Sequence, residues 1–148
     1  MSLKEQLAQD LKESMKNKQT VRKNTVQMVR TAILQKEKDE KVTLDDGDIL
    51  EVIAKQLKQR KDALPEYEKS GREDLISQLK EEMDVLMGYL PKQLTPDELR
   101  PIVEAAVKET GASSMRDMGK VMAAVMPQVK GRADGKAVNA IAKELFGN

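Results

Sequence analysis

The sequence contains no histidine and no cysteine, and these two absences restrict its possible chemistry severely. Without a thiol or an imidazole, the chain has no disulfide framework, no Cys–His or Ser–His nucleophilic site and no zinc site of the usual ligand set. We therefore expect no catalytic residue, no bound metal and no cofactor. Any enzyme built from this chain would have to use carboxylates, lysines and hydroxyls.

Aromatic residues and long apolar runs are also scarce. Tyr67, Tyr89 and Phe146 are the aromatic residues of the chain, and we expect them to pack on helix faces. A platform on which single-stranded bases stack is therefore not expected. No window approaches eighteen apolar residues, and the first residues carry charge instead of a signal-peptide core. These features predict a soluble, cytoplasmic protein with no membrane partner.

Charge is spread unevenly along the chain, although the net charge is only +1. Residues 1–42 carry ten basic and six acidic side chains, residues 43–98 carry eight and fourteen, and residues 99–148 carry eight and five. Both ends are therefore basic and the middle is acidic. This layout indicates a partner, because a polyanion such as nucleic acid would be attracted to the two positive ends.

Apolar residues recur every three or four positions almost throughout, which predicts an all-α protein without strands. Capping residues such as Ser2, Thr20, Thr95 and Ser113 or Ser114 mark expected helix starts, and Gly71 and Gly111 mark expected ends. We expect Pro65 to kink or interrupt its helix. The expected helices cover approximately residues 2–17, 20–41, 43–71, 75–90, 95–111, 114–127 and 134–146, with Pro91 stopping the fourth and Pro101 delaying or bending the fifth.

A domain boundary is predicted near Pro91. The segment 89–94 leads into Thr95-Pro96-Asp97-Glu98, a capping box with proline at the first helical position, which is typical of a new helical unit. We therefore expect two small helical domains. The first covers residues 1–90 and contains the long helices, and the second covers residues 95–148.

The run Lys130-Gly131-Arg132-Ala133-Asp134-Gly135-Lys136 is the strongest candidate for a binding site. Three cations oppose the single acid Asp134, and two glycines allow another backbone to come close, a combination suited to phosphate. Lys120, Lys143 and the N–H groups that start the last helix add to it. The alternative interpretation is an ordinary connection between helices with solvated lysines.

Three other patterns favour structural interpretations. Residues 131–137 resemble a Walker A loop, but the glycines are too close and no hydroxyl residue follows Lys136. The acidic cluster around Asp45 lacks the spacing of a calcium loop and fits a helix N-terminus, which favours acids. The methionine row at positions 115, 118, 122 and 126 has the spacing of a buried helix face, although it could also form an adaptable partner groove.

At the same residues the chain resembles a known family. The stretches 117–122 and 130–135, with Val138-Asn139, resemble bacterial YqeY-like proteins, as do residues 58–62 and 89–94 upstream. These proteins share a tail-domain motif with the B subunit of the glutamyl/aspartyl-tRNA amidotransferase, a likeness confined to the carboxyl-terminal part. The resemblance implies two helical domains joined by a partly helical linker, the second being a three-helix tail domain.

The resemblance also carries an expectation about function. The amidotransferase tail is understood to contact tRNA, whereas its ATP and amide-transfer chemistry lies in a catalytic domain that this chain lacks. The RNA-contacting role carries over to Gly119, Lys120, Lys130, Gly131, Arg132 and Lys136, and charge adds Lys143.

We therefore predict a non-catalytic tRNA-binding or tRNA-associated accessory protein. One alternative is an adaptor whose helical hairpin or methionine face docks on a translation or tRNA-amidation enzyme. A third hypothesis is an accessory subunit of a glutamine-dependent carbon–nitrogen ligase.

Overall fold

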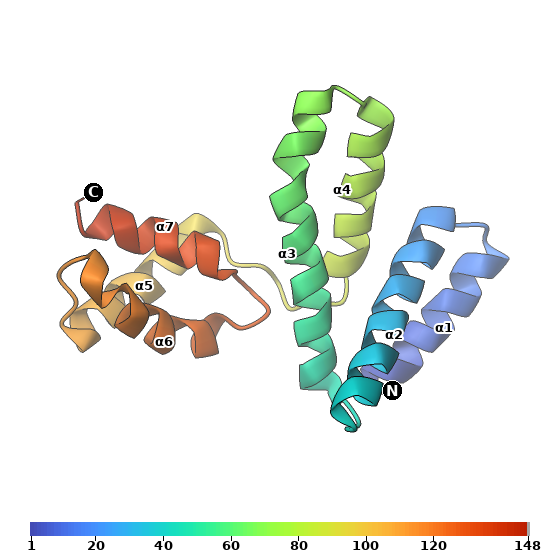
Figure 1. The fold of residues 1–148 in the computed structure, drawn as a ribbon, viewed down its shortest axis with the longest axis horizontal. Coiled ribbons are helices and arrows are strands. Elements are labelled where there is room, and N and C mark those ends of the chain that lie inside the picture. The colour runs from blue at the N-terminus through green and yellow to red at the C-terminus, as the bar shows by residue number, and fades with distance from the viewer. Residues whose placement is uncertain (148) are drawn as a thin grey trace. The chain divides into compact units, whose positions relative to one another are not determined.

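The structure, a computed structural model, describes residues 1–147 as an all-helical protein (Figure 1). This confirms the predicted fold class, and no strand occurs among the described residues. Residue 148, which ends the second predicted domain, lies outside them. The helices are α1 (Leu3–Lys16), α2 (Thr20–Glu40), α3 (Asp46–Ser70), α4 (Glu73–Met87), α5 (Pro96–Thr110), the short 3-10 helix η1 (Met115–Asp117), α6 (Met118–Val129) and α7 (Gly135–Leu145).

Contacts divide the chain into two compact units. The first unit is Met1–Leu90 and contains α1 to α4, and the second begins at Pro91 and contains α5 to α7. Each has its own apolar cluster. Residues 88–95 lie between α4 and α5 and are not helical. The sequence-based domain limits and the partly helical linker stay predictions.

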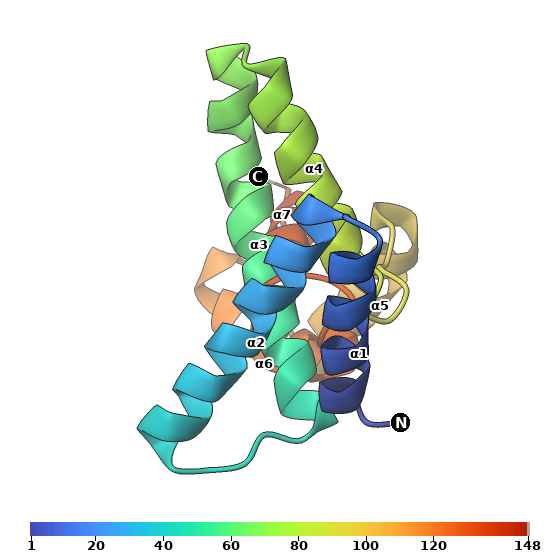
Figure 2. The same cartoon turned by 90° about the vertical axis from the view of Figure 1, so that its right-hand side faces the viewer.

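Two helical hairpins form the first unit. The α1–α2 hairpin packs against the α3–α4 hairpin, and the far end of α3–α4 extends beyond α1–α2 (Figures 1 and 2). Ile76 and Leu79 are the buried apolar residues of α4 near this end. The buried cluster of the unit consists of Leu7, Val26, Val29, Ile33, Leu44, Ile49, Ile53, Leu57, Leu86 and Leu90.

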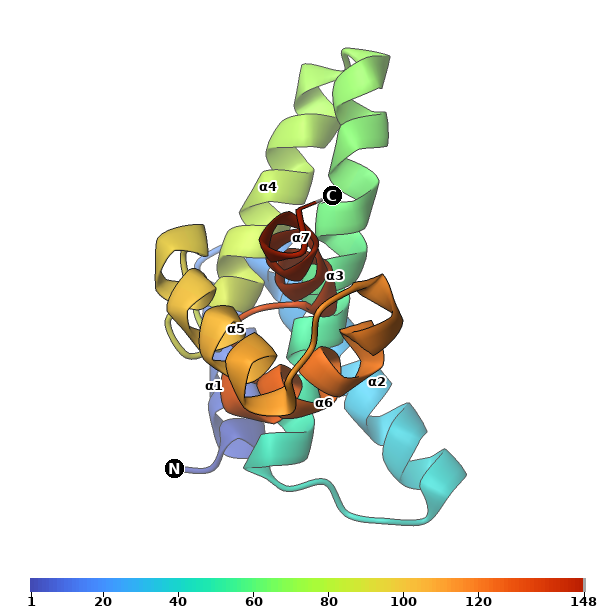
Figure 3. The same cartoon turned by 90° about the vertical axis from the view of Figure 1, so that its left-hand side faces the viewer.

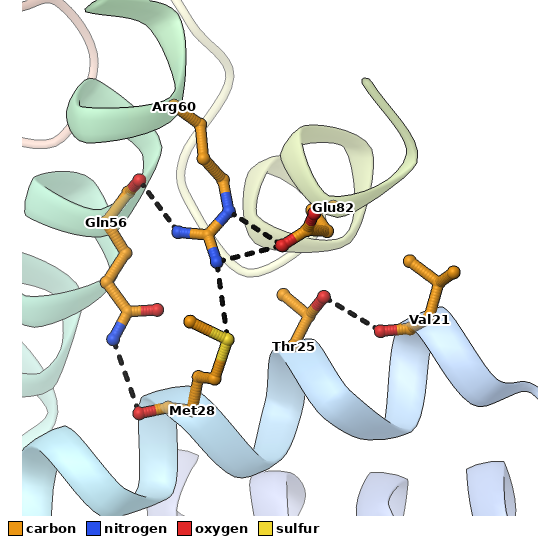
Figure 4. Close-up of polar contacts among 6 residues, drawn as sticks. All are labelled: Val21, Thr25, Met28, Gln56, Arg60 and Glu82. Carbon is orange, nitrogen blue, oxygen red and sulfur yellow. Dashed lines mark hydrogen bonds and ion pairs between the residues drawn. The ribbon is translucent and has the colours of Figure 1, made fainter. Parts of the chain in front are cut away.

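One ionic contact lies inside the first unit. Arg60 of α3 is only 7% exposed, and its Nε and Nη2 donate to the same carboxylate oxygen of Glu82 on α4 at 3.2 and 3.1 Å (Figure 4). Its Nη1 donates to the carbonyl of Gln56, and Nη2 also contacts the Met28 sulfur at 3.6 Å. The guanidinium therefore connects α2, α3 and α4.

The second unit packs α5, α6 and α7 around a separate core (Figure 3). Its buried residues are Leu99, Val103, Ala106, Val121, Val125, Val129, Val138, Ile141 and Ala142. The prediction of a core methionine row is only partly right. Met118, Met122 and Met126 pack at the edge of this core, but Met115 is 40% exposed. The valine row of α6 is the buried face, because it points between α5 and α7.

Most helix ends agree with the capping signals. The Ser2 hydroxyl accepts from the Glu5 amide, Thr95 and Glu98 form a complete capping box, and Gly71 and Gly111 end their helices with positive φ. Thr20 is wrong as a cap. It is the first residue of α2, and the preceding Gln19 makes no side-chain capping bond.

The expected interruption at Pro65, late helix start at Pro101 and helix end at Pro127 are wrong, whereas the expected kink or bend stays a prediction. Pro65 and Pro101 lie inside continuous helices, and α6 runs past Pro127 to Val129. All three prolines are exposed, so water can reach the carbonyl that each leaves without a helical partner. The fourth helix also ends at Met87, before the predicted stop at Pro91.

Candidate nucleic-acid interface

The candidate loop is a tight turn between α6 and α7. Gly131 has φ +76°, and the amides of Arg132 and Ala133 both donate to the carbonyl of Val129, at 2.7 and 3.1 Å. Asp134 then caps α7, since its carboxylate accepts from the Ala137 amide at 2.9 Å. Short hydrogen bonds and a capped helix thus fix the backbone of the loop.

The segment Lys92–Leu94, at the start of the second unit, lies along this loop. The Gln93 side-chain amide donates to the Gly131 carbonyl at 2.7 Å, and the Leu94 amide donates to the Arg132 carbonyl at 2.9 Å. In return, Nε of Arg132 donates to the Lys92 carbonyl at 3.2 Å. Sequence reasoning missed this pairing, because the partners are about forty residues apart and no local pattern signals it.

This pairing brings a fourth basic residue to the loop. Lys92, Lys130 and Lys136 are exposed and Arg132 is half-buried. The Lys92 backbone is held against Arg132, so the basic loop consists of Lys92, Lys130, Arg132 and Lys136. Arg132 also has a structural role there, because its guanidinium holds the Lys92 carbonyl.

Two acidic residues partly offset the positive charge of the basic loop. Asp134 lies within it as the helix cap. The pKa of Glu98 lies below its usual value, first because its carboxylate accepts the Thr95 amide in the capping box, and to a smaller extent because Lys92 and Arg132 are near. The local balance is four cations against two carboxylates.

The other predicted contacts lie elsewhere. Gly119 and Lys120 are in the first turn of α6, whereas Lys130 directly follows its last residue. Eleven residues of helix between Gly119 and Lys130 correspond to about 16 Å along the helix axis. Lys143 is in the last turn of α7, which runs antiparallel to α6 (Figure 1). Of the seven predicted residues, the structure therefore brings together only Lys130, Gly131, Arg132 and Lys136.

The glycines of the candidate site have structural explanations. Gly131 adopts the left-handed conformation that the turn requires. A Cβ on Gly135 would lie 3.1 Å from the methyl group of Met122, so this glycine serves the contact between α6 and α7. A Cβ on Gly119 would meet no atom within 4 Å, so neither backbone conformation nor a close contact requires glycine at this position.

The acidic cluster of α3 is engaged at the helix start. Asp45 and Asp48 form a reciprocal capping box, and Asp46 accepts from the Leu3 amide at 3.0 Å. Within residues 1–147 no group of three or more acidic, histidine or cysteine side chains is arranged to hold a metal. Within the same residues, every helix is too short or too polar to cross a bilayer.

A family model described as "Yqey-like protein" matches residues 4–146. The chain belongs to the YqeY-like family. The expected family resemblance is therefore confirmed over almost the whole chain.

Curated relatives of this YqeY-like chain are named "Altered inheritance of mitochondria protein 41, mitochondrial". The protein from Pyrenophora tritici-repentis is 31% identical over 144 residues, covering 95% of this chain and 79% of the relative. Those from Kluyveromyces lactis and Vanderwaltozyma polyspora are 40% and 30% identical over 84 and 119 residues. These matches cover 56% and 76% of this chain, and 45% and 64% of the relatives.

The relatives also correct one prediction. A cytoplasmic location was expected from the absence of a signal-peptide core, but the three relatives are named as mitochondrial proteins. The prediction of a cytoplasmic protein is therefore wrong. The absence of a signal-peptide core does not distinguish the cytoplasm from a mitochondrion.

Proposed function

We propose that this YqeY-like protein is a non-catalytic accessory protein that binds tRNA, contacting its phosphates through the second unit. The observation that carries the proposal is the basic loop, where Lys130, Arg132 and Lys136 lie in or directly after one fixed turn and the backbone of Lys92 is hydrogen-bonded to it. Lysines and arginines on a rigid backbone suit phosphate contacts, which position a folded RNA without reading its sequence. The scarcity of aromatic residues agrees with this mode of binding.

The main test is tRNA binding by fluorescence anisotropy at several salt concentrations. We expect the triple variant Lys92→Gln/Lys130→Gln/Lys136→Gln to bind more weakly. The slope of log affinity against log salt should also become shallower, by about one for each phosphate that the variant no longer neutralises. Arg132 is left unchanged, because its removal would also free the Lys92 carbonyl.

A matched control removes the same charge elsewhere. Lys69, Lys80 and Lys108 are exposed, and their replacement by glutamine lowers the net charge equally. We expect affinity close to that of the unmodified protein. Equal losses of affinity in both triple variants, or an unchanged salt slope in the first, would show that the basic loop is not the binding site.

Asp134 gives an independent test of opposite sign. Asparagine is as good a helix cap as aspartate, so Asp134→Asn removes a charge from the basic loop while keeping the α7 cap. We expect this variant to bind tRNA more tightly and to unfold at a similar temperature. Weaker or unchanged affinity would argue against phosphate contact at this position.

The adaptor and ligase-subunit hypotheses remain alternatives with different expected results. Cross-linking in cells would recover RNA with the chain if it binds tRNA. A pull-down after nuclease treatment would still capture a protein partner if the chain is an adaptor. A ligase subunit would support glutamine-dependent amidation when supplied with its partner subunits. An adaptor that docks through its methionine face is less well supported than one that docks through its helical hairpin, because Met118, Met122 and Met126 pack against the core of the second unit.

A further inference from the structure

The hairpin of α1 and α2 carries an excess of positive charge that the basic loop does not include. No acidic residue occurs from residue 14 to residue 36, although the whole chain has 25 acids against 26 basic residues. This stretch covers the end of α1, the turn and most of α2, two helices that pack against each other (Figure 2). Its six cations are Lys16, Lys18, Arg22, Lys23, Arg30 and Lys36.

Two half-buried acids of the hairpin already have partners. Asp10 accepts from the Tyr89 hydroxyl and pairs with Arg22 at 3.5 Å. Glu37 pairs with Lys4 at 2.6 Å. Within residues 1–147, five other cations of the hairpin form neither an ion pair nor a side-chain hydrogen bond. We call them the basic hairpin face, and they are Lys12, Lys16, Lys18, Lys23 and Arg30.

Four of these cations form two rows beside the contact between α1 and α2. On α1, Lys12 and Lys16 continue at four-residue steps from Lys4. On α2, Lys23 and Arg30 are seven residues apart, so they share one side of the helix, about 10 Å from each other along its axis. The two rows meet, because Lys4 and Arg30 line the same small groove between the helices.

The turn between the two rows is held by backbone hydrogen bonds. The Gln19 amide donates to the Ser14 carbonyl at 2.9 Å. The Lys18 amide donates to the Met15 carbonyl at 3.3 Å, and Lys18 has φ +55°. Its exposed side chain therefore extends from a fixed backbone, as the cations of the basic loop do.

The charge of the hairpin changes sign from one end to the other. Near the turn, Glu13 is the acid that has no cation partner within residues 1–147, and the Gln9 side-chain amide donates to it at 3.3 Å. The basic hairpin face thus opposes five cations to one carboxylate, a larger excess than that of the basic loop. At the far end of α2 and the start of α3, the acids are Glu37, Asp39, Glu40, Asp45, Asp46 and Asp48. A polyanion is therefore attracted to the turn end of the hairpin.

The surface of this hairpin suits RNA better than a membrane. Its helices contain no aromatic residue, and their exposed large apolar residues are Met15, Met28 and Leu34. A helix that lies in a membrane surface needs a continuous apolar face, typically with aromatic residues. Separate cations on rigid helices instead suit the phosphates of a folded RNA.

We propose that the basic hairpin face is a second surface for tRNA, which contacts phosphates of the same tRNA that the basic loop binds. This inference rests on the proposed function, because it gives the first unit a share in the same binding. The two surfaces belong to different units and would neutralise different phosphates. Their contributions to affinity should therefore be additive.

Fluorescence anisotropy of the full chain with tRNA at several salt concentrations tests this proposal. We expect Lys12→Gln/Lys16→Gln/Lys23→Gln to bind about tenfold more weakly at about 50 mM salt. The slope of log affinity against log salt should become shallower by about one for each phosphate lost. Combining this variant with the triple variant of the basic loop should reduce the slope by the sum of the two losses. The matched control is again the glutamine variant of Lys69, Lys80 and Lys108, with affinity close to that of the unmodified protein.

Gln27 allows a test in both directions. It is exposed and lies between Lys23 and Arg30 in the α2 row. We expect Gln27→Lys to tighten tRNA binding and to steepen the salt slope by about one, and Gln27→Glu to weaken binding. The same two exchanges at exposed Gln78 of α4 are the control and should leave affinity unchanged. Circular dichroism should show equal helicity in all these variants.

The possible results separate this proposal from the proposed function. Weaker binding by the basic-loop variant, with unchanged binding by the hairpin and Gln27 variants, would overturn the second surface and leave the proposed function intact. An unmodified chain that does not bind tRNA would overturn both. Vesicles of phosphatidylcholine and phosphatidylserine in equal parts provide the last comparison. If the hairpin variant loses affinity for these vesicles and keeps its affinity for tRNA, the face binds anionic lipid and the proposal is overturned.

Discussion

Arg60 is the one charged residue that falls among the buried positions of residues 1–147. Its partner Glu82 has a side chain that is 17% exposed, so the pair lies at the edge of the core of the first unit. Forming such a pair requires removing both charges from water, and its net contribution to stability is small when both partners are present. Removing only one partner has a much larger effect.

Glu82→Ala should therefore destabilise the protein by about 3 kcal/mol, because it leaves the Arg60 guanidinium buried without its carboxylate. Urea denaturation measures this loss. Asp62→Ala is the matched control, because it breaks the exposed ion pair with Lys58, and we expect a change of about 0.5 kcal/mol or less. Similar losses of stability in both variants would show that burial of Arg60 has no energetic consequence.

Glu37 makes stability depend on acidic pH. The pKa of its carboxyl lies below the usual 4.5, mainly because Lys4 donates to it at 2.6 Å and also because the Leu44 amide does so at 2.8 Å. A carboxyl with a lowered pKa in the folded state contributes stability above pH 4.5. That contribution is lost as the pH falls through the lowered value.

We expect the free energy of unfolding to fall on acidification below about pH 4.5, and Glu37→Gln to reduce this dependence. Urea denaturation at pH 6 and pH 3 compares the two proteins. An identical pH dependence in the variant would mean that other carboxyls cause the loss.

At the scale of helices and turns, two glycines of the candidate site should respond oppositely to substitution. Gly131→Ala forces a side chain into the left-handed region and should destabilise the protein by about 1–2 kcal/mol. Gly119→Ala adds a methyl group in open space within α6 and should be neutral or stabilising by up to about 0.5 kcal/mol.

Thermal denaturation of the two variants measures this difference. A stable Gly131→Ala protein would show that the turn can change its conformation. Normal tRNA affinity for Gly119→Ala would remove Gly119 from the predicted contacts, because its stability is not reduced.

At the scale of the whole molecule, the two cores predict separable folding. We expect a fragment of residues 1–90 to fold alone, because its buried cluster contains no residue of the second unit. For the second unit, the fragment 91–148 should be more stable than 96–148 by about 1–3 kcal/mol. The shorter fragment lacks the hydrogen bonds that Lys92, Gln93 and Leu94 make with the loop.

Circular dichroism and urea denaturation of the three fragments test this prediction. An unfolded 1–90 fragment would show that the first unit needs the second for stability. Equal stability of the two shorter fragments would show that the segment before α5 contributes nothing to the second unit.

The sequence by itself determined the helices and most of their ends, because a 3.6-residue apolar period and a capping side chain act between near neighbours. Asp134, Thr95 and Gly111 were predictable in this way. Exposure decided the effect of the prolines instead, and it is a property of the packed helices. Pro65 was predicted to kink or interrupt its helix, and only the fold shows that it lies on an exposed face of a continuous α3.

Only the tertiary structure decided which residues make up the candidate site. The sequence grouped Gly119, Lys120 and Lys143 with the loop by charge and family resemblance. The length of α6 separates the first two from the loop, and the length of α7 separates Lys143 from it. It missed Lys92, which a hydrogen bond across forty residues brings to Arg132. Contacts between distant segments depend on the packing of whole helices, and no local pattern of residues encodes them.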